Sequence, residues 1–449
     1  MKFKDLLASS SILSVPGLVS IFISLLAIPI HLKYAGPENY GNYIIFHFIL
    51  LVSINFNLGI GKSVTISINN FLSKKKEISY EAIIYTKNIT LIIFIIFLTL
   101  FFLQKNNVFN FTKYYEYMPH LFIGSIITIF FITFEGILQG NRKFKSISIL
   151  NLFFFSLSTS IPSLILIYKN DLNLENLILI SILIKFFTVF MMFLIIKNNN
   201  LYKISKNKIL MTNLKKNSKW ITLNSILIQF YDLFDKYLIK IFLGPIAVAT
   251  YSIPQQLTGK LSIISKSFSA FLLPDLSRKK INNLNFNFSL KVFIKFIPIL
   301  IFILVPFYSV ILKLWLGNNY NETIHSLTKI FSLSIIFSCA SHILITKFEA
   351  TKTLYKNLKI EFFLLPFFLI ALFFLTTNNF PLFVIGILIL SKEMLLFFLR
   401  LNFLKYEIVE FKEYYFFSLY FLFLLFLSFY NQNLYYLSLI PLVIIFLKK

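Results

Sequence analysis

Residues 177–196 read LILISILIKFFTVFMMFLII, twenty residues in which Lys185 is the only charged side chain. A helix of about 20 mainly apolar residues is long enough to cross the hydrocarbon core of a bilayer. The next segment, 197–219, reads KNNNLYKISKNKILMTNLKKNSK and contains seven lysines. An apolar stretch followed by a basic one predicts a membrane-spanning helix that ends on the cytoplasmic side.

The same alternation extends over the whole chain of 449 residues, which is 57% hydrophobic and only 14% charged. A soluble domain of this length carries more charge than that. We therefore expect an all-α, polytopic membrane protein with fourteen candidate spans. They begin near residues 6, 41, 83, 117, 147, 177, 220, 250, 291, 323, 360, 381, 414 and 435. The last is the shortest and contains Pro441, so counts of twelve or thirteen spans are alternatives.

The orientation follows from the distribution of lysine and arginine. With a cytoplasmic N-terminus, the segments assigned to the inside carry 28 of the 43 basic residues, and those assigned to the outside carry four. This asymmetry satisfies the positive-inside rule and predicts that both termini are cytoplasmic. The first apolar run continues to about residue 32 without a small-residue cleavage site, so we interpret it as a retained span and not a signal peptide.

The basic segment 197–219 divides the chain into two sets of six spans, 1–196 and 220–403, and residues 404–449 add spans 13 and 14. Each set has a Gly-Pro pair at the outer end of its first span, Gly36-Pro37 and Gly244-Pro245. Recurrence at the same topological point favours an internal repeat. Since six is even, the two six-helix bundles would be related by a pseudo-two-fold axis along the membrane normal.

Several functional classes lack their signatures. Gly61-Lys62-Ser63 resembles the end of a P-loop, but the required first glycine is replaced by Phe56. The five histidines have no metal-ligand spacing. The lysine-rich loops lack the interleaved aromatics of a nucleic-acid platform. We expect no cofactor, no metal, no nucleic-acid partner and no enzymatic activity.

Eleven lysines fall inside candidate spans, where a charge at the bilayer centre costs about 2.5–3.5 kcal/mol on insertion scales. Lys185, Lys260 and Lys392 lie near mid-span, and Lys392 adjoins Glu393, with which a structural pair is the simple explanation. Lys62 and Lys266 lie close enough to an interface for the ammonium group to reach water.

The span that begins near residue 220 has the densest charge. Asp232, Lys236 and Lys240 recur at i, i+4 and i+8, with Asp235 beside them. Two interpretations remain open: a neutral Asp232–Lys236 pair that only joins helices, or a charged stripe that lines a central cavity and receives an anionic head group and a coupling cation. The candidate substrate-binding residues are Lys62, Lys185, Asp232, Asp235, Lys236 and Lys260.

Three regions of the chain carry recognisable short motifs. They are Gly36–Tyr43 (GPENYGNY) with Asn57–Gly61 (NLGIG); Glu135–Gly140 (EGILQG) with Lys143–Lys145; and Asp235–Lys236 with Phe242–Gly244, Ala249–Ile253 and Leu273–Arg278. In order and placement these motifs resemble those of bacterial polysaccharide flippases of the O-antigen repeat-unit (Wzx) type. They span about residues 30–280. Asn57 departs from the family pattern, because an acid is usual there, and fourteen spans exceed the usual twelve.

The resemblance implies the fold of the multidrug/oligosaccharidyl-lipid/polysaccharide exporter superfamily. It also implies translocation of a polyprenyl-diphosphate-linked oligosaccharide (an O-antigen, capsule or exopolysaccharide repeat unit) to the outer leaflet of a bacterial inner membrane. The partners implied are that lipid-linked sugar, membrane lipid, a coupling proton or sodium ion, and polysaccharide polymerase and assembly proteins. The alternatives are a drug/cation antiporter of the same superfamily, or a membrane polymerase or glycosyltransferase, which would need a sizeable outer loop.

Overall fold

The computed structural model describes residues 3–52, 59–105, 118–169, 173–204, 207–277 and 283–404. All regular elements in these ranges are helical and none is a β-strand, which confirms the all-α class. The predicted spans that begin near residues 414 and 435 lie outside the described residues, so the count of fourteen stays a prediction.

The helices α1 to α7, here called the N-terminal half, coincide with the first six predicted spans. The element α1 contains two helices that meet at a kink at Gly36 and correspond to spans 1 and 2, α2 follows within span 2, and span 5 contains a π-helical segment. The elements are α1 (Phe3–Val52), α2 (Ile60–Asn70), η2 (Leu72–Lys74), α3 (Lys75–Lys105), α4 (Met118–Gly140), α5 (Phe144–Asn151), η4 (Leu152–Leu157), α6 (Ser158–Ile165) and α7 (Leu174–Asn198).

The helices α8 to α15, here called the C-terminal half, coincide with predicted spans 7 to 12. Span 8 is broken at Lys260, between α9 and α10, and span 9 is broken at a short 3-10 turn. The elements are α8 (Lys208–Leu243), α9 (Pro245–Gly259), α10 (Ser262–Leu276), α11 (Asn283–Leu304), η5 (Val305–Phe307), α12 (Tyr308–Leu316), η6 (Gly317–Asn319), α13 (Glu322–Ala350), α14 (Leu354–Thr377) and α15 (Leu382–Phe403).

Helix α8 begins earlier than its lysine content suggested. The sequence predicted a linker as far as residue 219, whereas the helix begins at Lys208. The side chain of Asn207 accepts a hydrogen bond from the backbone N–H of Leu210 at 3.3 Å and so caps the first turn. Because lysine is a good helix former, a basic composition did not exclude a helix here.

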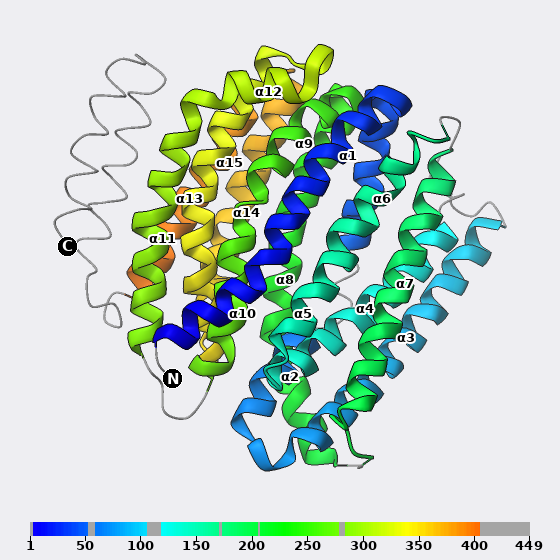
Figure 1. Ribbon diagram of the computed structural model, residues 1–449, viewed down its shortest axis with the longest axis vertical. Coiled ribbons are helices and arrows are strands. Elements are labelled where there is room, and N and C mark those ends of the chain that lie inside the picture. Colours follow the sequence, from blue (N-terminus) through cyan, green and yellow to red (C-terminus); the bar gives the residue numbers. More distant parts are fainter. Residues whose placement is uncertain are drawn as a thin grey trace.

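The halves lie side by side, and α1 crosses the face between them (Figure 1). Within the N-terminal half α4 packs against α2 and α7, and within the C-terminal half α13 packs against α9, α10, α11 and α15. Helix α1 contacts α5 and α6 of its own half and α9 and α10 of the other. The interface between the halves is therefore built mainly on α1, α2, α8, α9 and α10.

The two Gly-Pro turns adopt the same backbone conformation. Gly36 has φ 80° and ψ 164°, and Gly244 has φ 86° and ψ 172°. This region of the Ramachandran map is essentially restricted to glycine. Pro245 then occupies the first turn of α9, where its missing N–H costs nothing. The shared conformation supports the predicted internal repeat, and the two-fold relation of whole halves stays a prediction.

Gly61 and Gly136 are required by a close helix contact. A Cβ on Gly61 would lie 2.6 Å from the Ile132 carbonyl oxygen, and one on Gly136 would collide with the Gly61 carbonyl. The hydroxyl of Thr65 donates to the Gly136 carbonyl across this contact at 3.0 Å. The Gly-Lys-Ser triplet thus has a packing role in the α2–α4 interface, as small residues have between membrane helices.

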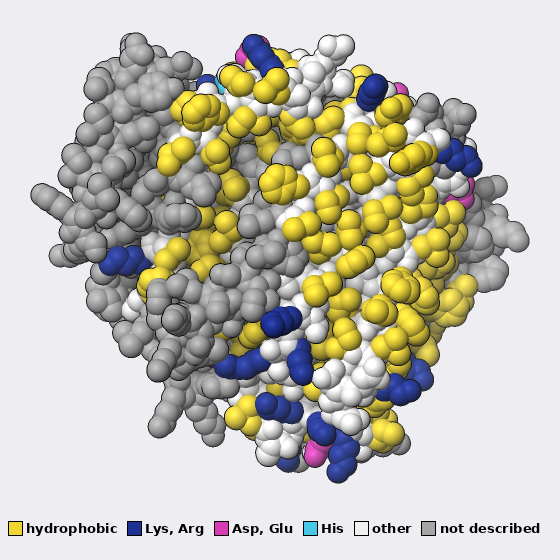
Figure 2. Space-filling view, in the orientation of Figure 1, with side chains coloured by type: hydrophobic (Ala, Val, Ile, Leu, Met, Phe, Trp, Pro, Cys, Tyr) yellow, Lys and Arg dark blue, Asp and Glu magenta, His cyan; other side chains and the backbone are white. Residues whose placement is uncertain are grey.

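The surface matches a lipid environment. Within the described ranges, seven helical stretches are long and apolar enough to cross a membrane: Leu72–Thr99, Pro119–Gly140, Phe144–Ile165, Leu174–Asn198, Glu322–Ala350, Leu354–Thr377 and Leu382–Phe403. Figure 2 shows apolar side chains across the middle of one face and Lys and Arg gathered mostly toward its lower end. Phe187 on α7 and Phe367 on α14 are both more than half exposed. Large exposed apolar patches of this kind favour contact with hydrocarbon.

Candidate functional site

Asp235 and Lys236 form a buried pair on α8. Each side chain is 1% exposed, and Lys236 Nζ lies 3.2 Å from Asp235 Oδ1. The hydroxyl of Tyr251, on α9, donates to Asp235 Oδ2 at 2.6 Å. The carboxylate is therefore held by a cation and a phenol, as a buried charge requires. The structure brings these two predicted residues together inside the C-terminal half.

Lys392 on α15 is another buried lysine of this half. Its Nζ lies 3.0 Å from Glu393 Oε1, which confirms the expected pair. The same ammonium lies 4.6 Å from the ring centroid of Tyr231 on α8 and 5.2 Å from that of Phe368 on α14. An ion pair and two cation–π contacts offset the loss of hydration.

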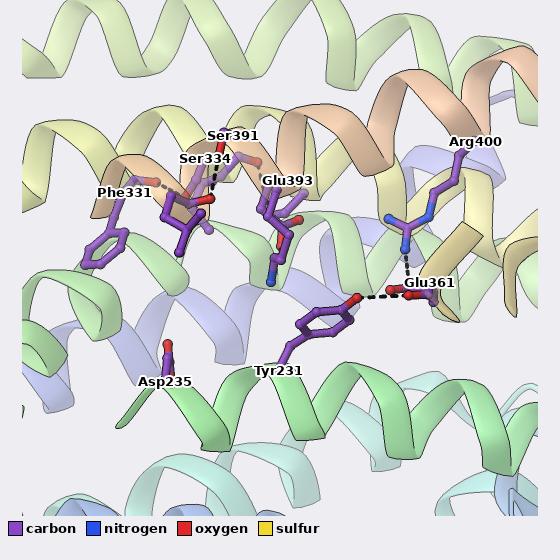
Figure 3. A network of polar contacts seen from close by, with 12 residues as sticks. Tyr231, Asp235, Phe331, Ser334, Glu361, Ser391, Glu393 and Arg400 are labelled. Carbon is purple, nitrogen blue, oxygen red and sulfur yellow. Dashed lines mark hydrogen bonds and ion pairs between the residues drawn. The ribbon is translucent and has the colours of Figure 1, made fainter. Parts of the chain in front are cut away.

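A third buried pair, Arg400 with Glu361, joins α15 to α14 (Figure 3). Arg400 Nε also donates to Asn357 Oδ1 at 2.8 Å. The hydroxyl of Tyr231 donates to the backbone carbonyl of Glu361 at 3.0 Å. Arg400 is buried inside the helix bundle, where Glu361 supplies the opposite charge.

Lys185 on α7 lies in the N-terminal half and is only 5% exposed. Its ammonium lies 5.4 Å from the ring centroid of Phe154, in the π-helical segment of span 5. It is also close enough to His47 on α1 for a coulombic interaction. The predicted residues thus divide between the halves, with Lys185 in one and the Asp235–Lys236 pair in the other.

Two ion pairs join the halves at the end that the sequence predicts to be cytoplasmic. Lys62 Nζ on α2 lies 2.6 Å from Glu349 Oε1 on α13, with side-chain exposures of 48% and 2%. Arg142, in the turn after α4, pairs with Asp275 on α10. Both pairs therefore depend on the relative position of the two halves.

The opposite end, which carries the Gly-Pro turns, has contacts of its own. The hydroxyl of Tyr40 donates to Gln256 Oε1 at 3.3 Å, and Lys240 Nζ donates to Asn42 Oδ1 at 3.2 Å. A Cβ on Gly41 would lie 2.6 Å from the Pro245 carbonyl oxygen. The halves are thus in contact at both ends.

A group of basic residues gathers between the halves. We call Lys62, Lys260, Lys266 and His342 the basic cluster. Lys266, on α10, is exposed and acts electrostatically on Lys260 and on His342 of α13. Lys62, on α2, acts on the same histidine. At 1.5 Å per residue, Lys62 lies about 12 Å before the end of α2 and Lys266 about 15 Å before the end of α10. The two halves therefore present positive charge at a similar depth.

The remaining predicted residue is Asp232, whose side chain lies outside the described residues. Sequence reasoning missed Glu349, Glu361, Arg400 and the role of Lys266. A signal existed for Glu349 and Glu361, since each is an acid at the edge of an apolar run. Their partners are 287 and 39 residues away in the chain, so the sequence did not indicate which base each would meet.

The described part of the chain contains no group of three or more His, Cys, Asp and Glu side chains that could hold a metal ion. The protein has two contacting helical halves, a lipid-facing exterior, buried ion pairs and a basic cluster between the halves. This is the architecture of a membrane transporter.

Comparisons with known proteins identify the family. Residues 6–280 match the polysaccharide biosynthesis protein family, and the chain belongs to that family. The chain is similar to a putative O-antigen transporter of Shigella flexneri, with 25% identity over 226 residues. That match covers 48% of this chain and 52% of the relative, so it spans about half the length of each.

Solved structures show the same fold. A crystal structure of MATE in complex with MaL6 has a TM-score of 0.68 and 15% identity, and the match covers 90% of this chain and 97% of the other. A MOP superfamily transporter from Pyrococcus furiosus, described as having a binding pocket of reverse polarity, has a TM-score of 0.67 and 14% identity. The match covers 90% of this chain and 96% of the other. The chain therefore has the fold of this transporter superfamily, and the relatives named here are transporters and not enzymes.

Proposed function

We propose that this protein is a flippase that moves a polyprenyl-diphosphate-linked oligosaccharide from the cytoplasmic to the outer leaflet of a bacterial inner membrane. The family is that of polysaccharide biosynthesis proteins, and the Shigella flexneri relative is named as an O-antigen transporter. The diphosphate and sugars of such a lipid do not cross hydrocarbon unaided, so a polar path between the halves is needed.

The basic cluster is the observation that carries the proposal. Lys62 and Lys266 are exposed although they lie within helices that run between the halves. Both lysines lie within reach of the interface, so their exposed ammonium groups are hydrated and open to a charged ligand that enters between the halves. Lysine binds phosphate through short, charge-assisted hydrogen bonds. Two lysines from opposite halves can therefore bind one diphosphate. Binding would then affect the relative position of the two halves.

The charge balance favours this substrate over an organic cation. The buried carboxylates Asp235 and Glu361 are each paired with a base, so neither is left to receive a cationic drug. Among the described residues, Glu349 pairs with Lys62 and Glu135 lies within electrostatic range of the same lysine, whereas no ion pair joins Lys266 or Lys260 to a carboxylate. A cation antiporter would need the opposite balance in its binding region. We therefore assign the anionic lipid to the basic cluster and a positioning role to the Asp235–Lys236 pair.

The test is the appearance of lipid-linked sugar in the outer leaflet of vesicles that contain the purified protein. Lys266→Gln removes one charge-assisted hydrogen bond, so we expect the apparent affinity to fall by about tenfold or more. Lys87→Gln is the matched control, because Lys87 is an exposed lysine of α3 outside the basic cluster. Equal transport by wild type, Lys266→Gln and Lys62→Gln would contradict the proposed site. An imposed proton or sodium gradient in the same vesicles would show whether transport is ion-coupled.

A further inference from the structure

The N-terminal half contains a polar cluster that the proposed transport path does not use. Tyr43 lies between two imidazoles of α1, with ring centroids 4.9 Å from His31 and 4.5 Å from His47. The Tyr43 hydroxyl donates to the Thr159 carbonyl at 3.0 Å, and His31 Nδ1 lies 2.9 Å from Ser163 Oγ. These contacts hold both imidazoles against α6 in the interior of the half.

Three buried polar atoms on α1 and α7 have no hydrogen-bond partner among the residues that the structure describes. They are Nε2 of His31, Nε2 of His47 and Oγ of Ser181. The two histidines and Ser181 are at most 9% exposed. Ser181 lies one helical turn before Lys185 on α7, so the two side chains share a face of that helix. Buried polar groups are normally satisfied, and each of these three groups is able to donate a hydrogen bond, so they leave capacity for a ligand that accepts hydrogen bonds.

Lys185 has no carboxylate partner within the described part of the chain. Its contacts there are the Phe154 ring and the electrostatic interaction with His47. The described carboxylates of this half lie elsewhere: Glu38 is exposed, Glu77 is in the first turn of α3, Glu81 accepts from the Asn207 backbone, Glu135 accepts from Asn151 and Glu175 lies beside His120.

The C-terminal half provides an internal comparison. Lys392 lies on α15, the last described helix of its half, as Lys185 lies on α7, the last of its own. Each ammonium sits over a phenylalanine of the preceding span, Phe368 and Phe154. Lys392 is neutralised by Glu393, whereas Lys185 is not neutralised by a described residue. A buried ammonium is stabilised by a counter-charge, and none of the described residues supplies one to Lys185.

We infer that Lys185, His47 and Ser181 form a binding site for a small monovalent inorganic anion of the size of chloride. The ammonium supplies the charge, and the imidazole N–H and the serine hydroxyl supply two further hydrogen bonds. A metal cation is disfavoured because the ammonium would repel it. A lipid diphosphate is disfavoured because the side chains are enclosed, in contrast to the exposed lysines of the basic cluster.

The experiment is equilibrium binding of radiolabelled chloride to the purified full-length protein, with sodium gluconate holding the ionic strength constant. We expect saturable binding by wild type that bromide displaces and inorganic phosphate does not. Lys185→Gln should abolish it, and Ser181→Ala, a smaller change, should weaken it about tenfold, the loss of one hydrogen bond to an ion. Lys392→Gln is the matched control and should bind as wild type does.

Three results would overturn the inference: no saturable chloride binding by wild type, binding by Lys185→Gln and Ser181→Ala with wild-type affinity, or displacement by phosphate as effective as by bromide. If Lys185→Gln fails to fold, Ser181→Ala alone decides the question. Since the measurement involves no lipid-linked sugar, its outcome is independent of the outcome of the flippase assay.

Discussion

Replacing Arg400 by methionine should lower the free energy of unfolding by about 3–5 kcal/mol, the usual cost of removing one partner of a buried ion pair. Arg400 and Glu361 are 3% and 1% exposed, and the guanidinium also donates to Asn357. Glu361 Oε2 has no hydrogen-bond partner, and Tyr231 bonds the backbone carbonyl and not the carboxylate. Without Arg400 the buried charge would have nothing to compensate it.

The assay is thermal unfolding of the purified variants in one detergent. Arg142→Met is the matched control: its pair with Asp275 has side chains 28% and 15% exposed, so we expect a loss of about 1 kcal/mol or less. Adding Glu361→Gln to Arg400→Met removes the uncompensated charge and should restore part of the stability. The reasoning is refuted if Arg400→Met is no less stable than Arg142→Met, or if the double variant is no more stable than Arg400→Met.

The same assay tests two further predictions. Gly36→Ala and Gly244→Ala should each cost about 1–3 kcal/mol from backbone strain alone, because a Cβ at either position meets no atom within 4 Å. Gly259→Ala, equally open but without a positive φ, should change stability by about 0.5 kcal/mol or less, and equal effects at all three positions would exclude strain. Lys62→Gln should cost more than Glu349→Gln, because it leaves a buried carboxylate unpaired, whereas the reverse change leaves an exposed ammonium that water can solvate. Equal losses would show that burial does not control this pair.

The periodicity and charge of the chain were sufficient to predict the helical class, the helices of spans 1 to 12 and the special role of Gly36 and Gly244. These properties depend only on residues that are close together in the sequence. A helix needs about 20 apolar residues to cross a bilayer, and a Gly-Pro pair favours the end of a helix. The predicted linker was too long, since Asn207 caps a helix that its lysines can continue. The pairing of Lys392 with Glu393 was predictable because the two residues are adjacent.

The identity of most partners was decided only by the tertiary structure. Depth along a helix can be read from a sequence, but rotation about the helix axis is set by packing against neighbouring helices. For this reason the sequence did not indicate that Lys62 meets Glu349 or that Arg400 meets Glu361, although all four residues are charges in or beside apolar runs. The same rotation brings Lys185 to His47 and Phe154, with no described carboxylate in contact, and so creates the site that we assign to an anion.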